Sequence, residues 1–130
     1  MTAFPNFPDL AAYLLVYMAR ADGQVHYLED ASLKEEMKHF TDQPGAVLKH
    51  ADEVYVAEPG VSIDDIFSAN NQLVESISYD TRMELIRSLY AIINSDGRVH
   101  EDEMAALRKI RAGLETSDGH PGGMVATEYI

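Results

Sequence analysis

The chain has 130 residues, 46% hydrophobic and 25% charged, and its 22 acidic and 10 basic side chains give a formal net charge of −12. This length predicts one domain with enough buried surface to fold without metal or disulfide crosslinks. The absence of cysteine excludes a disulfide framework, a thiolate zinc site and a cysteine nucleophile. Acids outnumber bases in both halves of the chain, which argues against binding to a nucleic-acid backbone, because that requires clustered Lys and Arg.

No segment has the pattern of a signal peptide or a membrane span. Residues 1–9 contain no Lys or Arg, and the longest apolar run, residues 10–19, has only ten residues before Arg20. We therefore expect a cytoplasmic protein that makes no contact with a membrane.

Apolar residues recur at helical spacing along most of the chain, and no segment alternates with the period of a strand. The first expected helix has Asn6 as its N-cap and Pro8 in its first turn, and it ends before Gly23. The next two helices are expected at about residues 27–40 and 46–57, with a break between them.

The second half of the chain predicts three more helices. Ser62 is the expected cap of a helix whose apolar stripe continues to Ile77 with a polar interruption at Asn70. Thr81 and Glu84 have the spacing of a capping box and predict the start of the fifth helix. The sixth helix is expected at about residues 101–114.

Beyond Gly113 the composition changes to a Gly-rich segment that cannot hold a helix. The sequence therefore predicts an all-α fold, a single compact bundle of about six helices over residues 1–114, followed by a Gly-rich C-terminal tail over residues 115–130.

An internal repeat is the most informative feature of the sequence. Residues 21–29 align with residues 95–103 at an offset of 74, and both copies read Asp-Gly-x-Val-His-x-x-Glu. The similarity extends outward to further paired positions, including Leu15 with Leu89, Ala31 with Ala105 and Leu33 with Leu107. Two whole helix–turn–helix units are therefore repeated, and not the turns alone.

A structural role explains every shared position of the two turns. Glycine suits a helix end at which φ becomes positive, and valine anchors the turn in the core. His26 and His100 fall at the expected N-caps of the following helices. Glu29 and Glu103 fall three residues later, where a carboxylate accepts a hydrogen bond from the cap amide.

The same residues are also candidate metal ligands. Asp-Gly-x-Val-x-x-x-Glu matches the second half of an EF-hand calcium loop, but the ligand positions of the first half hold side chains such as Met18 and Ile92. We therefore do not expect an ordinary pair of EF-hands. Turns lying side by side would instead pool six side chains around one divalent ion: Asp22, His26, Glu29, Asp96, His100 and Glu103. Mixed imidazole and carboxylate ligands favour zinc, manganese or iron over calcium.

With its doubled turn, the segment from Leu10 to Leu114 resembles the tellurite-resistance TerB-like family. Members are compact, all-helical, cytoplasmic bacterial domains with two helix–turn–helix units that carry Ala-Asp-Gly-x-[Val/Ile]-x-x-x-Glu. The resemblance carries over Asp22, Gly23 and Glu29 with Asp96, Gly97 and Glu103, and it implies a divalent-metal site at the acidic positions. His26 and His100 depart from the Ser or Thr that is frequent in the family, which puts the identity of the metal in doubt. The resemblance implies a part in stress response and no established catalytic reaction.

These observations predict a non-enzymatic, metal-binding domain of a bacterial stress-response assembly. The alternative is a protein-interaction module with purely structural turns, which binds its partner through a helix groove or through the tail at Tyr129 and Ile130. Both hypotheses include a protein partner, exclude nucleic acid and membrane, and leave a homo-oligomer open. An enzyme ranks third, because the sequence has no nucleophile elbow, phosphate-binding glycine loop or HExxH motif.

Overall fold

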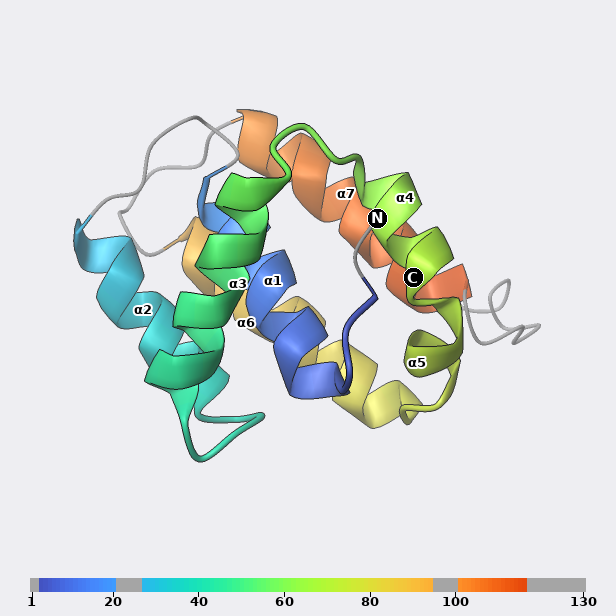
Figure 1. The fold of residues 1–130 in the computed structure, drawn as a ribbon, viewed down its shortest axis with the longest axis horizontal. Coiled ribbons are helices and arrows are strands. Elements are labelled where there is room, and N and C mark those ends of the chain that lie inside the picture. The colour runs from blue at the N-terminus through green and yellow to red at the C-terminus, as the bar shows by residue number, and fades with distance from the viewer. Residues whose placement is uncertain (1–2, 21–26, 95–100, 117–130) are drawn as a thin grey trace.

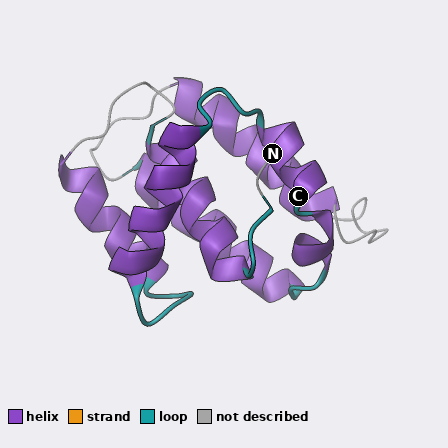
Figure 2. Cartoon of the chain, viewed as in Figure 1, coloured by secondary structure: helices purple, strands orange, loops and turns teal. Residues whose placement is uncertain are grey.

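The computed structural model describes residues 3–20, 27–94 and 101–116, and these residues form seven helices and no strand (Figure 2). The helices in chain order are α1 (Phe7–Ala19), α2 (Tyr27–Met37), α3 (Pro44–Ala57), α4 (Ile63–Ala69), α5 (Asn71–Glu75), α6 (Tyr79–Ile93) and α7 (Glu101–Thr116). The predicted all-α class is confirmed for this part of the chain. Within it, no helix is long and apolar enough to cross a membrane.

Helix α1 lies at the centre of the bundle (Figure 1). Ten of its thirteen residues are buried, and it packs against α2, α3, α6 and α7. A helix enclosed on every side must be apolar all round, which accounts for the uninterrupted apolar run that the sequence shows at residues 10–19.

The sequence repeat is also a repeat of packing. Shifting residue numbers by 74 converts α1 into α6 and α2 into α7, and the contacts follow the same rule, since α1 packs on α7 while α2 packs on α6. Equivalent positions have equivalent burial: Leu15 and Leu89 are both fully buried, whereas Ala31 and Ala105 are both exposed. The two helix–turn–helix units therefore form a four-helix arrangement with approximate two-fold symmetry, to which α3 and α4 add packing on opposite units.

Two of the predicted helix starts are confirmed by their caps. The side-chain oxygen of Asn6 accepts a hydrogen bond from the backbone N–H of Asp9 at 2.9 Å, and Pro8 lies in the first turn of α1. Ser62 accepts from the N–H of Asp65 at 3.1 Å at the start of α4.

The prediction of one helix from Ser62 to Ile77 is wrong, because the chain breaks at Asn70 into α4 and α5. The Asn70 side chain is buried, accepts from the backbone N–H of Phe4 at 2.8 Å and donates to the carbonyl of Ile66 at 2.9 Å. These bonds fix Asn70 outside helical geometry and join the N-terminal segment to α4, which raises the number of helices from about six to seven.

Thr81 is also not the N-cap of the next helix. Ser78 takes that role and accepts from the N–H of Thr81 at 3.1 Å, so α6 begins two residues before Thr81. Arg82, in the first turn of α6, is buried and donates to the carbonyl of Val74 at 3.0 Å. A serine three residues upstream thus competes successfully with the threonine that the capping-box pattern favours.

Smaller differences occur at the ends of α2 and α3. Helix α2 ends at Met37 rather than at residue 40, because residues 38–40 tighten into i→i+3 hydrogen bonds such as that from the N–H of Phe40 to the carbonyl of Met37 at 2.9 Å. Helix α3 begins at Pro44, two residues before the predicted start.

Gly113 does not end the last helix, which continues to Thr116. A glycine is required here by close packing: a Cβ added at Gly113 would lie 2.6 Å from a ring carbon of Phe67 on α4. The predicted change of character therefore begins after the helix, whose buried Leu114 belongs to the core.

We expect Gly113→Ala to destabilise the fold by about 1–3 kcal/mol, because the new methyl overlaps the Phe67 ring and overpacks the α4–α7 contact. Gly45→Ala is the matched control, since a Cβ there meets nothing within 4 Å and α3 gains a better helix former. Urea unfolding followed by circular dichroism measures both variants. Equal stability of the two variants would show that the contact between α4 and α7 does not require glycine.

Candidate functional site

The helix ends that flank the two Asp-Gly turns correspond residue by residue. Helix α1 ends at Ala19 and α6 ends at Ile93, while α2 begins at Tyr27 and α7 begins at Glu101. Each pair of ends differs by the repeat offset of 74, so the intervening segments, residues 20–26 and 94–100, have the same length.

The residues that leave α1 and α6 also share one backbone conformation. Arg20 has φ −98° and ψ 5°, and Asn94 has φ −90° and ψ 1°. Their N–H groups donate to the carbonyls of Val16 at 3.0 Å and Tyr90 at 3.1 Å, respectively. Both turns therefore begin in the same direction from equivalent helix ends.

One cavity connects the start of the first turn with the end of the second. It has a volume of about 290 Å³, and its lining includes Arg20 at the end of α1, Asp102 in the first turn of α7, and Tyr17 and Tyr55 from α1 and α3. The end of α1 and the start of α7 therefore lie beside one cavity, at the upper left of Figure 1. Each of these two helix ends borders one of the two Asp-Gly turns.

Of the six candidate ligands, four lie outside the described residues: Asp22, His26, Asp96 and His100. Glu29 is the third residue of α2 and Glu103 the third residue of α7, so the two helices hold them at equivalent positions. The side chain of Glu29 also falls outside the description, whereas that of Glu103 is completely buried, at 0% exposure.

Burial sets Glu103 apart from its acidic neighbours Glu101 and Asp102, which are exposed in the same helical turn. All three are favoured there by the dipole of α7. A buried carboxylate is stable only when hydrogen bonds or a cation compensate its lost hydration. The placement of Glu103 is therefore compatible with capping of α7 and equally with metal ligation.

Within residues 3–20, 27–94 and 101–116, no group of three or more Asp, Glu or His side chains is arranged to hold a metal ion. This search does not test the predicted set of six ligands, because four of them lie outside the described residues. The predicted metal set therefore stays a prediction.

The interaction that fixes the end of α1 is not predicted by the sequence. The Arg20 guanidinium donates through Nε to Oδ1 of Asp52 on α3 at 2.9 Å and through Nη2 to the same oxygen, and it stacks over the Tyr55 ring at 5.5 Å. Two charge-assisted hydrogen bonds from one guanidinium to a single, partly buried carboxylate oxygen orient both groups. They hold the residue directly before the first turn against α3. The only signal in the sequence is a lone Arg at the end of an apolar helix.

Three tyrosines pack together beside this ion pair. The ring centroids of Tyr13, Tyr17 and Tyr55 lie 6.0–6.3 Å from one another. Burial, with a smaller contribution from the two neighbouring phenols, raises the pKa of Tyr13 to about 12, and burial also raises the pKa of Tyr17. The interpretation of Tyr13, Tyr17 and Tyr55 as core-packing residues agrees with this geometry.

The comparisons with known proteins bear directly on the repeated unit. A family model described as "Tellurite resistance protein TerB" matches residues 9–120, a range that contains both Asp-Gly turns and all of α1 from Asp9 onward. The chain belongs to the TerB family. Neither the curated proteins nor the solved structures include a significant match to it.

Membership of the TerB family confirms the resemblance that the doubled turn predicted. It covers both helix–turn–helix units of this TerB domain and the helices α3 to α5 that connect them. The family assignment thus rests on the whole bundle as well as on the two short motifs.

The tyrosine cluster predicts a specific loss of stability in alkali. Between pH 10 and about 12 the unfolded chain ionises Tyr13 while the folded chain keeps it protonated, so stability falls as pH rises through this window. We expect Tyr13→Phe to make this fall less steep, while Tyr79→Phe, at a residue that is 52% exposed, leaves it unchanged. Thermal unfolding measured by circular dichroism across the window checks the difference. A wild-type slope in Tyr13→Phe would contradict the assignment.

Proposed function

We propose that this TerB domain is a non-enzymatic component of a bacterial stress response, acts in the cytoplasm with a protein partner, and binds one divalent metal ion where its two turns meet. The proposed ligands are Asp22, His26 and Glu29 from the first turn with Asp96, His100 and Glu103 from the second. The ion would join the two repeated units into one site.

The single observation that carries this proposal is the common location of the two turn flanks. Arg20 directly precedes the first turn, Asp102 follows the second, and both line one cavity. Ligand sets on two turns can share an ion only when their flanking helix ends come together in this way.

The donor chemistry supports the same proposal. Carboxylate and imidazole groups are the usual ligands of zinc, manganese and iron, and histidine favours these ions over calcium. Glu103 adds a carboxylate already removed from bulk water, which strengthens its attraction to a cation. When bound, the ion would neutralise part of the negative charge of the four proposed carboxylate ligands and connect the two turns.

A second candidate function is a protein-interaction module in which the turns are purely structural. The position of Glu103 as the third residue of α7 supports it, because this is the position at which a capping carboxylate closes a helix start. If this is the role of the residue, Glu103→Gln lowers stability by the same amount in EDTA and in zinc, while Glu101→Gln in the same turn has a smaller effect, because it removes only a favourable interaction with the helix dipole. If the tail binds the partner, deletion of residues 117–130 abolishes binding and leaves α7 complete.

Isothermal titration of the metal-free protein with zinc, manganese and calcium tests the metal site. We expect one ion per chain, zinc and manganese bound more tightly than calcium, and loss of binding in both Asp22→Ala and Asp96→Ala, because a shared ion needs both turns. At a hundredfold excess of ion over Kd, binding should also stabilise the fold by about 2.7 kcal/mol.

Asp80→Ala is the matched control, because Asp80 is an exposed acid in the first turn of α6, away from both Asp-Gly turns. Tyrosine emission gives a second signal, since the chain has no Trp and Tyr17 and Tyr55 line the cavity beside the turns. Two ions per chain, with each aspartate variant removing one, would contradict a shared site. No binding at micromolar concentrations would contradict metal binding altogether.

A further inference from the structure

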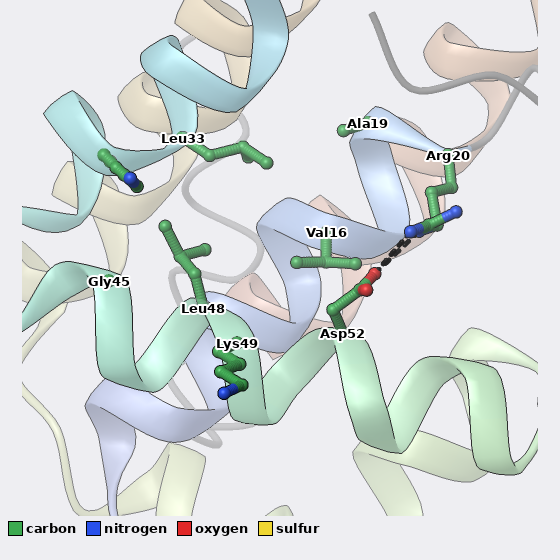
Figure 3. A pocket seen from close by; sticks show the side chains of 9 residues that line it. Val16, Ala19, Arg20, Leu33, Gly45, Leu48, Lys49 and Asp52 are labelled. Carbon is green, nitrogen blue, oxygen red and sulfur yellow. Dashed lines mark hydrogen bonds and ion pairs between the residues drawn. The ribbon is translucent and has the colours of Figure 1, made fainter. Parts of the chain in front are cut away.

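A second cavity lies on the other side of the Arg20–Asp52 ion pair, between α1, α2 and α3 (Figure 3). It has a volume of about 410 Å³, within the range of ligand-binding clefts. We call it the α1–α3 groove. Its lining comes from all three helices and includes Val16, Leu33, Lys34, Leu48, Lys49 and Asp52.

The floor of the α1–α3 groove is apolar. Val16, Leu33 and Leu48, one residue from each of the three helices, are between 4% and 8% exposed and turn their remaining surface into the cavity. In Figure 3, Leu33 and Leu48 point toward one another across the space, with Val16 beside them. A floor of this kind accepts an apolar side chain of a ligand.

The charge on the rim is opposite to that of the molecule. Three basic side chains, Arg20, Lys34 and Lys49, surround the groove with a single acid, Asp52, although the whole chain has a net charge of −12. Two of the four lysines of the chain are therefore at this one place.

Unlike Arg20, the two lysines are available to contact a ligand in the groove. Arg20 is engaged by Asp52, which closes one end of the groove (Figure 3). Lys34 and Lys49 are exposed, and neither forms an ion pair with any other residue of the described part of the chain. The groove thus offers two cationic contacts above an apolar floor.

A short peptide segment satisfies these contacts better than a polyanionic surface does. A membrane or a nucleic acid presents many negative charges, and the net charge of −12 opposes its approach. Salt screens charges that lie more than about 8–10 Å away at physiological ionic strength. A peptide with two carboxylates in the groove is therefore attracted mainly by the nearby lysines and repelled little by the distant acids. Walls made of helices are also typical of grooves that bind one face of an amphipathic helix.

We propose that the α1–α3 groove is the docking site for an acidic amphipathic helix of a partner protein. One apolar side chain of that helix enters between Val16, Leu33 and Leu48, and carboxylates one turn on either side of it contact Lys34 and Lys49. The site is separate from the two Asp-Gly turns and does not require a metal ion.

Gly45 allows the groove to be blocked without disturbing the core. A Cβ added there meets nothing within 4 Å, and Gly45 lines the groove at the start of α3. A large side chain at this position would extend into the space that the partner helix occupies. Gly45→Phe is therefore a steric test that leaves the floor residues intact.

The probe is a fluorescent, end-capped helical peptide whose leucines form one stripe flanked by glutamates, and the control peptide has the same composition in scrambled order. Fluorescence anisotropy measures binding in EDTA, so that the result is independent of the proposed metal site. We expect the striped peptide to bind and the scrambled peptide to bind at least tenfold more weakly. Gly45→Phe should abolish binding while circular dichroism shows an unchanged fold.

The charge contact is tested with two double variants that change the net charge equally. Lys34→Glu with Lys49→Glu should weaken binding on the order of tenfold or more, since each exposed ion pair contributes a small factor and reversal adds repulsion. Lys38→Glu with Lys109→Glu, at the other two lysines, should change it less than twofold.

Three outcomes would overturn the proposal. Equal binding by the two peptides would show that the groove does not recognise an amphipathic face. Equal losses of binding in the two double variants would show that only the overall charge of the protein matters. Binding that survives Gly45→Phe would place the peptide elsewhere. Vesicles of phosphatidylglycerol serve as a further probe. If they bind through Lys34 and Lys49 more tightly than the peptide does, the groove binds a membrane surface and the proposed peptide partner is wrong.

Discussion

The enclosure of α1 on all sides is the constraint on which the rest of the structure depends. Ten of the thirteen residues of α1 are buried, it packs against four other helices, and the first charged side chain after Asp9 in its first turn is Arg20 at its C-terminal end. The ion pair between Arg20 and Asp52 fixes that end against α3. It also separates two cavities, one toward α7 and the turns and the other toward α2. The burial of one helix thus determines where the chain emerges and which surfaces are available for binding.

In the repeat, α6 is the first helix of the second unit, as α1 is of the first unit. Their C-caps, Arg20 and Asn94, have nearly identical backbone angles, and the helices that follow begin at equivalent residues. The approximate two-fold packing places α1 against α7 and α2 against α6, and the end of α1 and the start of α7 line one cavity. The units are not equal elsewhere, because α3 covers the first and α4 packs on the second. The metal site proposed at the turns therefore depends on the two-fold relation between the units. The α1–α3 groove lies on the first unit, because α3 packs against α1 and α2.

The sequence predicted the features whose causes are local. A cap such as Asn6 or Ser62 acts on an amide three residues away, so its effect can be recognised from spacing alone. Asn70 and Gly113 could not be interpreted in this way, because the first is fixed by Phe4, 66 residues distant, and the second by Phe67 on another helix. The candidate ligands were recognisable because the repeat pairs them. The groove was not, because its lining comes from three helices and becomes one surface only in the folded chain.

We propose that the two Asp-Gly turns lie together at one end of the bundle and share one ion. Because the chain has no cysteine, Gln24→Cys with Arg98→Cys places one spin label in each turn at equivalent positions that are not candidate ligands. Pulsed electron paramagnetic resonance then measures the distance between the labels in EDTA and in zinc. We expect one short distance whose distribution narrows when zinc is added. A long distance, or a broad distribution that zinc leaves unchanged, would contradict this proposal.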